Sequence, residues 1–166
     1  QMKNNPNKLN QWVLIQFGHN DQPGKPGRST DLTTEYPVNL ENYVLETRAQ
    51  GAIPVLVTPL IRRSFKVGQH QDDLAPWATA MKTVATKLNV TMIDLHSMSR
   101  QKVIDVGEEQ ADKYAETPKG TPKFDRTHLG PLGACVFGSM VLNQLPVATK
   151  GALSVTTDKN CEASFR

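Results

Sequence analysis

Two short motifs in the sequence combine residue types that can catalyse acyl transfer. The first is Gly-His-Asn-Asp at residues 18–21, directly after the apolar run at residues 12–17. The side-chain amide of Asn20 can donate a hydrogen bond to an oxygen that becomes negatively charged in a transition state. Gly18 lets the backbone approach a ligand closely or adopt a positive φ. The first motif is therefore a candidate anion-stabilising loop at the end of a strand.

The second motif, Asp-Arg-Thr-His-Leu, occupies residues 125–129, just before the last expected helix. Asp125 and His128 are three residues apart, so the carboxylate can accept a hydrogen bond from the imidazole Nδ1–H within one turn. That bond fixes the tautomer and leaves Nε2 free as a general base. Together, the two motifs supply the carboxylate, the base and one oxyanion donor of an acyl-transfer site.

Each motif also has a simpler interpretation. His19 and Asn20 can be turn residues that satisfy a local loop. Asp125 can cap the following helix, with His128 in its first turn. We favour catalysis because both motifs are expected at the same edge of one sheet. The simpler interpretations would require two unrelated structural roles to place these residue types there by chance.

The elements that must position these motifs alternate between apolar runs and amphipathic segments. Continuous apolar runs are typical of strands covered on both faces, and they occur at residues 12–17, 53–57 and 90–95. Helical spacing of apolar residues predicts helices at residues 38–49, 74–88, 97–108 and 131–145, the second of them capped by Asp73. This alternation predicts an α/β fold with a parallel sheet and helices on both faces.

Ligands of such folds bind beyond the carboxyl ends of the strands, which is where the polar clusters of this sequence fall. Three strands are fewer than the five or so that sheets of this kind usually have. A three-stranded parallel sheet would leave an edge and an apolar face exposed. The chain is therefore expected to pair with another segment or to be part of a larger domain.

The composition excludes several classes of protein. The chain has 166 residues, 38% hydrophobic and 21% charged, which is typical of one globular domain. Aromatic residues make up only 6% and the net charge is +3, so nothing indicates nucleic-acid binding. No apolar stretch approaches the roughly 20 residues of a membrane span, and no signal peptide is visible.

The remaining histidines and the cysteines give weaker signals. His70 and His96 are expected to be surface or core residues, and no His, Asp or Glu spacing resembles a zinc site, so no metal is predicted. Cys135 and Cys161 either form a disulfide or remain thiols, since spacing in the sequence does not decide their geometry.

The stretches VLIQFGHND and FDRTHLGPLGA, with YVLETRAQGAIPVLVTPLIRRSF between them, resemble the SGNH (GDSL-type) hydrolase superfamily. Within it, the similarity is to the branch of rhamnogalacturonan acetylesterases and related pectin-type deacetylases, over about residues 11 to 145. The resemblance implies a three-layer α/β/α sandwich with a parallel, flavodoxin-like sheet of about five strands. It also implies a serine esterase that needs no cofactor.

The resemblance further implies a role for each motif residue. His128 would deprotonate the serine and later protonate the leaving alcohol, Asp125 would orient His128, and Asn20 would donate to the oxyanion. Gly18 would permit the close turn, and Asp21 would hold the site loop rather than react. His19 is usual in this branch, so its presence supports the resemblance rather than a role in the reaction.

The family's nucleophile is missing from this sequence. It belongs to a Gly-Asp-Ser motif that precedes the asparagine motif, and none of the seven serines here follows Gly-Asp. A second oxyanion donor, a backbone glycine, is missing too. Residues 1–166 are therefore expected to be the C-terminal part of one hydrolase domain, with residues 147–166 as a tail. We expect one of three explanations: the protein was nicked and its N-terminal fragment stays bound as a separate chain, the chain is truncated, or it is a non-catalytic relative that lost its serine.

The expected substrate is an acetylated polysaccharide of the pectin or rhamnogalacturonan type, or a small ester. Arg62 and Arg63 can line a cleft for an acidic sugar chain, because guanidinium groups bind carboxylates through paired hydrogen bonds; a solvated loop is the alternative. A non-catalytic carbohydrate-binding protein and an acyltransferase on the same scaffold stay open as other functions. The resemblance implies an extracellular or periplasmic location.

Overall fold

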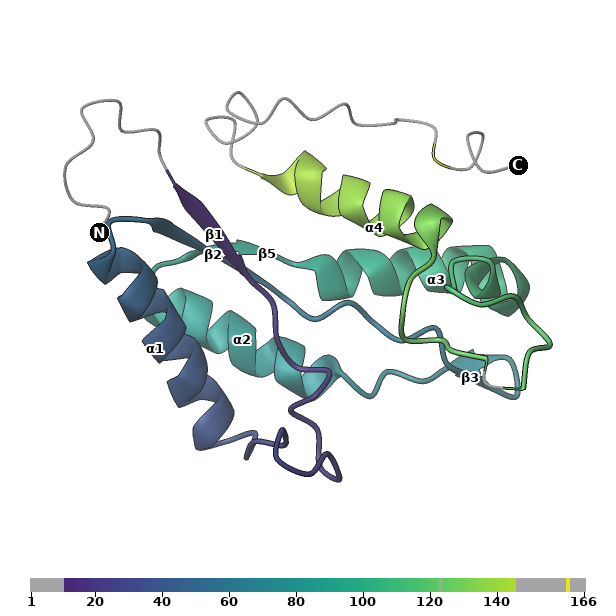
Figure 1. The fold of residues 1–166 in the computed structure, drawn as a ribbon, viewed down its shortest axis with the longest axis horizontal. Helices are drawn as coiled ribbons and strands as arrows, with labels where there is room; N and C mark the ends of the chain where they lie inside the picture. Colours follow the sequence, from purple (N-terminus) through teal and green to yellow (C-terminus); the bar gives the residue numbers. More distant parts are fainter. Residues whose placement is uncertain (1–10, 123, 146–160, 162–166) are drawn as a thin grey trace.

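The computed structural model describes residues 11–122, 124–145 and residue 161. The three predicted strands are present as β1 (Trp12–Ile15), β2 (Ile53–Val57) and β5 (Thr91–Ile93). They form a parallel sheet in the order β1-β2-β5 (Figure 1). The predicted α/β class is therefore confirmed.

The four predicted helices are also present, with different ends. They are α1 (Glu35–Ala49), α2 (Ala75–Lys87), α3 (Leu95–Asp112) and α4 (Pro131–Gln144). The prediction that Asp73 caps α2 is wrong, because the N-cap position is Leu74 and no side chain caps it. The end predicted for α3 is also wrong, since the helix continues to Asp112 across a kink at Gly107, where φ is 75°.

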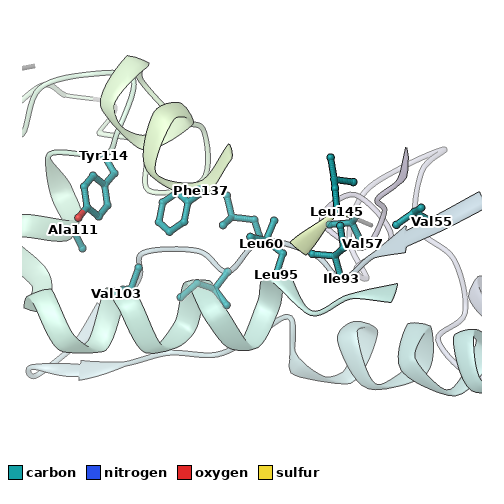
Figure 2. Close-up of a cluster of buried hydrophobic side chains, with 11 residues drawn as sticks. Val55, Val57, Leu60, Ile93, Leu95, Val103, Ala111, Tyr114, Phe137 and Leu145 are labelled. Carbon is teal, nitrogen blue, oxygen red and sulfur yellow. The ribbon is translucent and has the colours of Figure 1, made fainter. Parts of the chain in front are cut away.

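Alternate residues of β2 face two separate layers of helices. Val55 and Val57 belong to a buried cluster with α3 and α4, in which Tyr114 and Phe137 pack edge to face with ring centroids 5.4 Å apart (Figure 2). Leu56 belongs to a second cluster, with residues of β1, α1 and α2. A central strand with apolar side chains on both faces thus gives the three layers α/β/α.

The strand β1 lies at an edge of the described sheet, with β2 as its neighbour. Its apolar side chains are unusually exposed: Val13 by 39%, Leu14 by 45%, and Phe17, just after the strand, by 42%. Most apolar side chains on a parallel sheet are covered by helices. The exposure at β1 is what a three-stranded parallel sheet was expected to leave.

Two smaller features complete the description. The segment after β2 contains a short antiparallel hairpin of β3 (Phe65–Lys66) and β4 (Gln69–His70). A disulfide joins Cys135 in α4 to Cys161, with the Cα atoms 5.7 Å apart. The predicted tail otherwise lies outside the described residues. In the described part of the chain, no helix is long and apolar enough to span a membrane.

Candidate active site

The loop that follows β1 has a backbone conformation that requires its glycine. Gly18 has φ of 132°, and a Cβ atom there would lie 3.1 Å from side-chain atoms of Pro59. Its backbone N–H donates to Oδ2 of Asp21 at 2.9 Å. Oδ1 of the same carboxylate accepts from the hydroxyl of Thr30 at 3.1 Å. Asp21 therefore closes the turn that presents Asn20.

The second motif forms the predicted carboxylate–imidazole pair. Nδ1 of His128 and Oδ2 of Asp125 are 2.5 Å apart. Oδ1 of Asp125 accepts from the backbone N–H groups of Thr127, at 2.6 Å, and His128, at 3.1 Å. The bond to the His128 side chain and these two backbone bonds lower the pKa of Asp125 to about 2. Because α4 begins at Pro131, Asp125 is not the cap of that helix.

The imidazole of His128 is accessible. Its side chain is 73% exposed, whereas that of Asp125 is 33% exposed. Among the described residues, Nε2 of His128 has no hydrogen-bond partner. With Nδ1 bound to a carboxylate, the ring is held in the tautomer whose Nε2 can accept a proton.

Both motifs line a single cavity of about 470 Å³. Asn20, Asp125 and His128 all contribute to its wall. The other residues around it are Gln16, His19, Lys25, Leu60, Arg62, Thr127 and Leu129. A larger groove of about 730 Å³ lies between the start of β1 and the end of α1, but Glu46 is the only ionisable residue among those that line it. The smaller cavity, which is lined by Asn20, Asp125 and His128, is therefore the candidate active site.

His19 lies beside the catalytic pair and is partly buried. Burial lowers the pKa of His19, and the positive charge of Arg62 lowers it further. Its imidazole is therefore neutral at neutral pH. A neutral ring in the cavity wall adds no positive charge beside His128.

Arg62 lines the cavity and links the two motifs. Nη2 donates to the carbonyl of His19 and Nε to the hydroxyl of Thr127, each at 3.2 Å. Nη1 donates to Gln22 at 2.6 Å and pairs with Asp73 at 2.5 Å. The side chain is only 13% exposed. Its donors are thus occupied by the protein itself.

Arg63 is not placed to bind a substrate, which corrects the expectation from the sequence. It is fully buried, with an exposed fraction of 0%, and it is not among the residues that line the cavity. Nη2 donates to the carbonyl of His128 at 2.7 Å. Arg63 is thus buried against the backbone of the second motif.

Sequence reasoning missed several of the residues around the cavity. Lys25 is the one with a charge, and its only signal in the sequence is that it lies in a stretch rich in proline and glycine, which indicates a loop after the first motif. Leu60 links the cavity to the core cluster with Tyr114 and Phe137 (Figure 2). Nothing in the sequence marks it beyond its place after β2.

Two other polar features lie away from the cavity. His96 is buried and its Nε2 contacts Asp72 at 2.9 Å, while Nε2 of His70 contacts the carbonyl of Arg62 at 2.8 Å. Neither residue lines the cavity, and no serine lines it among the residues that the structure describes. No group of three metal-ligating side chains occurs within the same residues.

The chain is similar to proteins of known family. The model of the GDSL-like lipase/acylhydrolase family matches residues 1–139. A probable rhamnogalacturonan acetylesterase of Bacillus subtilis, YesY, is 34% identical over 131 residues, which are 78% of this chain and 59% of YesY. The rhamnogalacturonan acetylesterase RhgT of the same organism is 33% identical over 138 residues, 78% of this chain and 58% of RhgT. The chain thus spans somewhat over half the length of these relatives.

Solved structures show the same fold. The Bacillus subtilis protein YXIM superposes with a TM-score of 0.66 and 20% identity, over 86% of this chain and 38% of that one. Axe2, an acetylxylan esterase from Geobacillus stearothermophilus, gives a TM-score of 0.55 and 21% identity, over 81% of this chain and 58% of that one. The sandwich fold, the two motifs on one cavity and the match over residues 1–139 place this chain in the GDSL-like lipase/acylhydrolase family.

Proposed function

We propose that this chain carries the base, the orienting carboxylate and one oxyanion donor of a serine ester hydrolase. One observation carries the proposal: Asn20 and the Asp125–His128 pair line the same cavity at the carboxyl ends of the parallel sheet. The substrate we assign is an acetylated polysaccharide of the pectin or rhamnogalacturonan type. Two relatives support this choice, because RhgT is described as a rhamnogalacturonan acetylesterase and YesY as a probable one.

The reaction follows from the positions of these groups. Nε2 of His128 takes the proton of a serine hydroxyl as its oxygen attacks the acetyl carbonyl, while Nδ1–H donates to Asp125. The side-chain N–H of Asn20 donates to the oxyanion of the tetrahedral intermediate. His128 then protonates the leaving sugar hydroxyl, which leaves an acetyl-serine. Water, deprotonated by the same nitrogen, hydrolyses this intermediate to acetate and free serine.

The serine itself we assign to a segment that is not within residues 1–166. That segment would be a strand paired with the edge of β1 that has no neighbour among the described residues, with apolar partners covering Val13, Leu14 and Phe17. The exposure of these three side chains supports this arrangement. A hydroxyl at the carboxyl end of such a strand would lie next to Asn20, because the ends of neighbouring parallel strands meet at one edge of a sheet. The complementing segment is thus the partner we propose.

We propose an extracellular or periplasmic location as well. The disulfide between Cys135 and Cys161 supports it, since such bonds persist in oxidising compartments and are rare in the cytosol. A polysaccharide substrate fits the same location.

The substitution Asn20→Ala tests the proposed site. In the whole protein with its serine segment, we expect kcat for p-nitrophenyl acetate and for acetylated pectin fragments to fall about 10²- to 10³-fold, because one oxyanion donor is lost. Asn42→Ala, on the exposed side of α1, is the matched control and should leave kcat unchanged. Steady-state kinetics on both esters measure the effect.

Two assays of the wild-type protein test the proposed function as a whole. It should release acetate from the pectin fragments and react with a serine-directed fluorophosphonate. Hydrolysis of neither ester, together with no labelling, would reject the esterase proposal. Glycan binding that persists without labelling would indicate the non-catalytic carbohydrate-binding protein instead.

Lys25 is the cation that we assign to recognition of an acidic sugar. Arg62 already binds other groups of the protein and Arg63 is buried, whereas Lys25 lines the cavity and its ammonium has no partner among the described residues.

We expect Lys25→Gln to raise KM for an acidic oligosaccharide ester about tenfold, the effect of losing one charged hydrogen bond. KM for p-nitrophenyl acetate should not change. Lys66→Gln, on the hairpin away from the cavity, is the control. Equal KM values for wild type and Lys25→Gln on the acidic ester would contradict the assignment.

A further inference from the structure

The short segment at residues 58–63, which continues from β2, lies beneath the cavity and contacts both motifs. Its start is fixed inside the protein, since the hydroxyl of Thr58 accepts from the backbone N–H of His96 at 2.8 Å. Leu60 reaches the cavity wall, and Arg62 connects the two motif loops. The last residue of the segment, Arg63, has no part in the reaction described above.

Arg63 donates to three carbonyls of the loop that carries the catalytic pair. Its backbone N–H donates to the carbonyl of Arg126 at 3.0 Å. Its Nη2 donates to the carbonyls of His128, at 2.7 Å, and Asp125, at 3.4 Å. One residue therefore contacts the backbone of both catalytic positions and of the residue after Asp125.

The burial of this arginine lowers the stability of the fold. It is 0% exposed, and its Nε and Nη1 have no hydrogen-bond partner within the described residues. Burial lowers the pKa of Arg63 to about 10, against the opposing effect of the negative charges of Asp125 and Asp112. Burying a guanidinium with unpaired N–H groups is unfavourable. A buried apolar residue of similar size would avoid this penalty, so the contacts of Arg63 with the loop have to offset it.

A second arginine fixes the opposite side of the same loop. Arg126 donates from Nε and Nη2 to the carboxylate of Asp112, at 2.8 and 3.1 Å. Asp112 lies at the end of α3 and its side chain is only 2% exposed. The side chain of Arg126 thus binds the catalytic loop to α3, and the backbone carbonyls of the loop bind it to Arg63 in the segment at residues 58–63.

We propose that Arg63 is a positioning residue, which holds the loop at residues 125–128 so that the imidazole of His128 stays directed into the cavity and hydrogen-bonded to Asp125. The proposal rests on the esterase function proposed above. Both carbonyls accept from the single nitrogen Nη2, whose two N–H groups are fixed in the plane of the guanidinium. The N–H groups of a lysine ammonium instead rotate at the end of a flexible stem and would hold the two carbonyls less firmly. His128 has an exposed side chain, so its own packing does little to fix it.

The substitution Arg63→Met tests this in the whole protein with its serine segment. We expect kcat for p-nitrophenyl acetate to fall about 100-fold per active site, the effect of misplacing a catalytic group by about 1 Å. KM should change by less than about twofold, because Arg63 does not touch the substrate. Active sites are counted by fluorophosphonate labelling carried to completion, so molecules that fail to fold do not enter the value. Arg63→Lys should give an intermediate loss.

Arg48→Met is the matched control. Arg48 also donates to two backbone carbonyls, those of Leu88 and Asn89 at 2.9 and 3.2 Å, but it lies on α1 away from the cavity. This variant should lose stability and keep kcat per labelled site. A direct readout is the ¹H NMR signal of the imidazole N–H that is bonded to Asp125, which should disappear in Arg63→Met and persist in Arg48→Met.

Three outcomes would overturn the role of Arg63. They are an unchanged kcat per labelled site in Arg63→Met, an unchanged imidazole N–H signal in that variant, and full activity in Arg63→Lys. If the wild-type protein hydrolyses no ester, the proposed function fails instead, while the NMR comparison still decides whether Arg63 positions His128.

Discussion

Replacing His128 by alanine is expected to lower kcat of the whole protein for p-nitrophenyl acetate by about 10⁶-fold, as removal of a triad histidine does in serine hydrolases. Without this imidazole, the cavity loses the carboxylate-oriented base that we propose accepts the serine proton and returns it to the leaving alcohol. Reaction with a fluorophosphonate should be lost as well, since it needs the same activated serine. Steady-state kinetics and labelling followed by mass spectrometry measure the two effects.

The chain offers a matched control for this variant. His96 also pairs with a carboxylate, that of Asp72, at 2.9 Å, but it lies outside the cavity. His96→Gln should lower the stability of the fold and leave kcat per labelled site unchanged. If His128→Ala kept more than about a hundredth of the wild-type kcat, His128 would not be the base, because general-base catalysis alone supplies about 10²- to 10⁴-fold.

The substitution Asp125→Asn is expected to lower kcat about 10⁴-fold with little change in KM. The asparagine can present its amide N–H₂ to Nδ1, which favours the tautomer protonated at Nε2, and that tautomer does not accept the serine proton. Raising the pH should not restore activity. The bonds from His128 and the loop backbone hold the pKa of Asp125 near 2, so the wild-type carboxylate is ionised throughout the neutral and mildly acidic range.

The control for Asp125→Asn is Asp72→Asn, which changes the carboxylate of the buried His96 pair in the same way. It should leave kcat per labelled site unchanged. The pH dependence of kcat for both variants provides the measurement. Full activity of Asp125→Asn would mean that the carboxylate does not select the tautomer of His128, and the assignment of the catalytic pair would fail.

The sequence carried the information that places the two motifs together. Runs such as residues 53–57 are apolar at every position, and only a strand covered on both faces needs that pattern. Asn20 and the Asp125–His128 pair could therefore be expected at one edge of a parallel sheet. The bond between Asp125 and His128 is local, spanning three residues, so spacing alone was enough to predict it.

Long-range contacts explain what the sequence did not reveal. Arg63 is charged and follows another arginine, which is typical of a surface loop, and its burial depends on carbonyls more than sixty residues further along the chain. Asp73 has the residue type and place of a helix cap, but its carboxylate pairs with Arg62 instead. The disulfide between Cys135 and Cys161 likewise depends on how the chain returns to α4.

The open edge of β1 sets a strict condition on the strand that would join it. Side chains alternate between the two faces of a sheet, and each residue advances about 3.3 Å along a parallel strand. A slip of one residue in the new pairing would turn the serine to the opposite face, and a slip of two would carry its hydroxyl about 7 Å past the imidazole. Under the proposed function, only one alignment at this edge would give an active enzyme, so the strand would have to pair in that register for catalysis to occur.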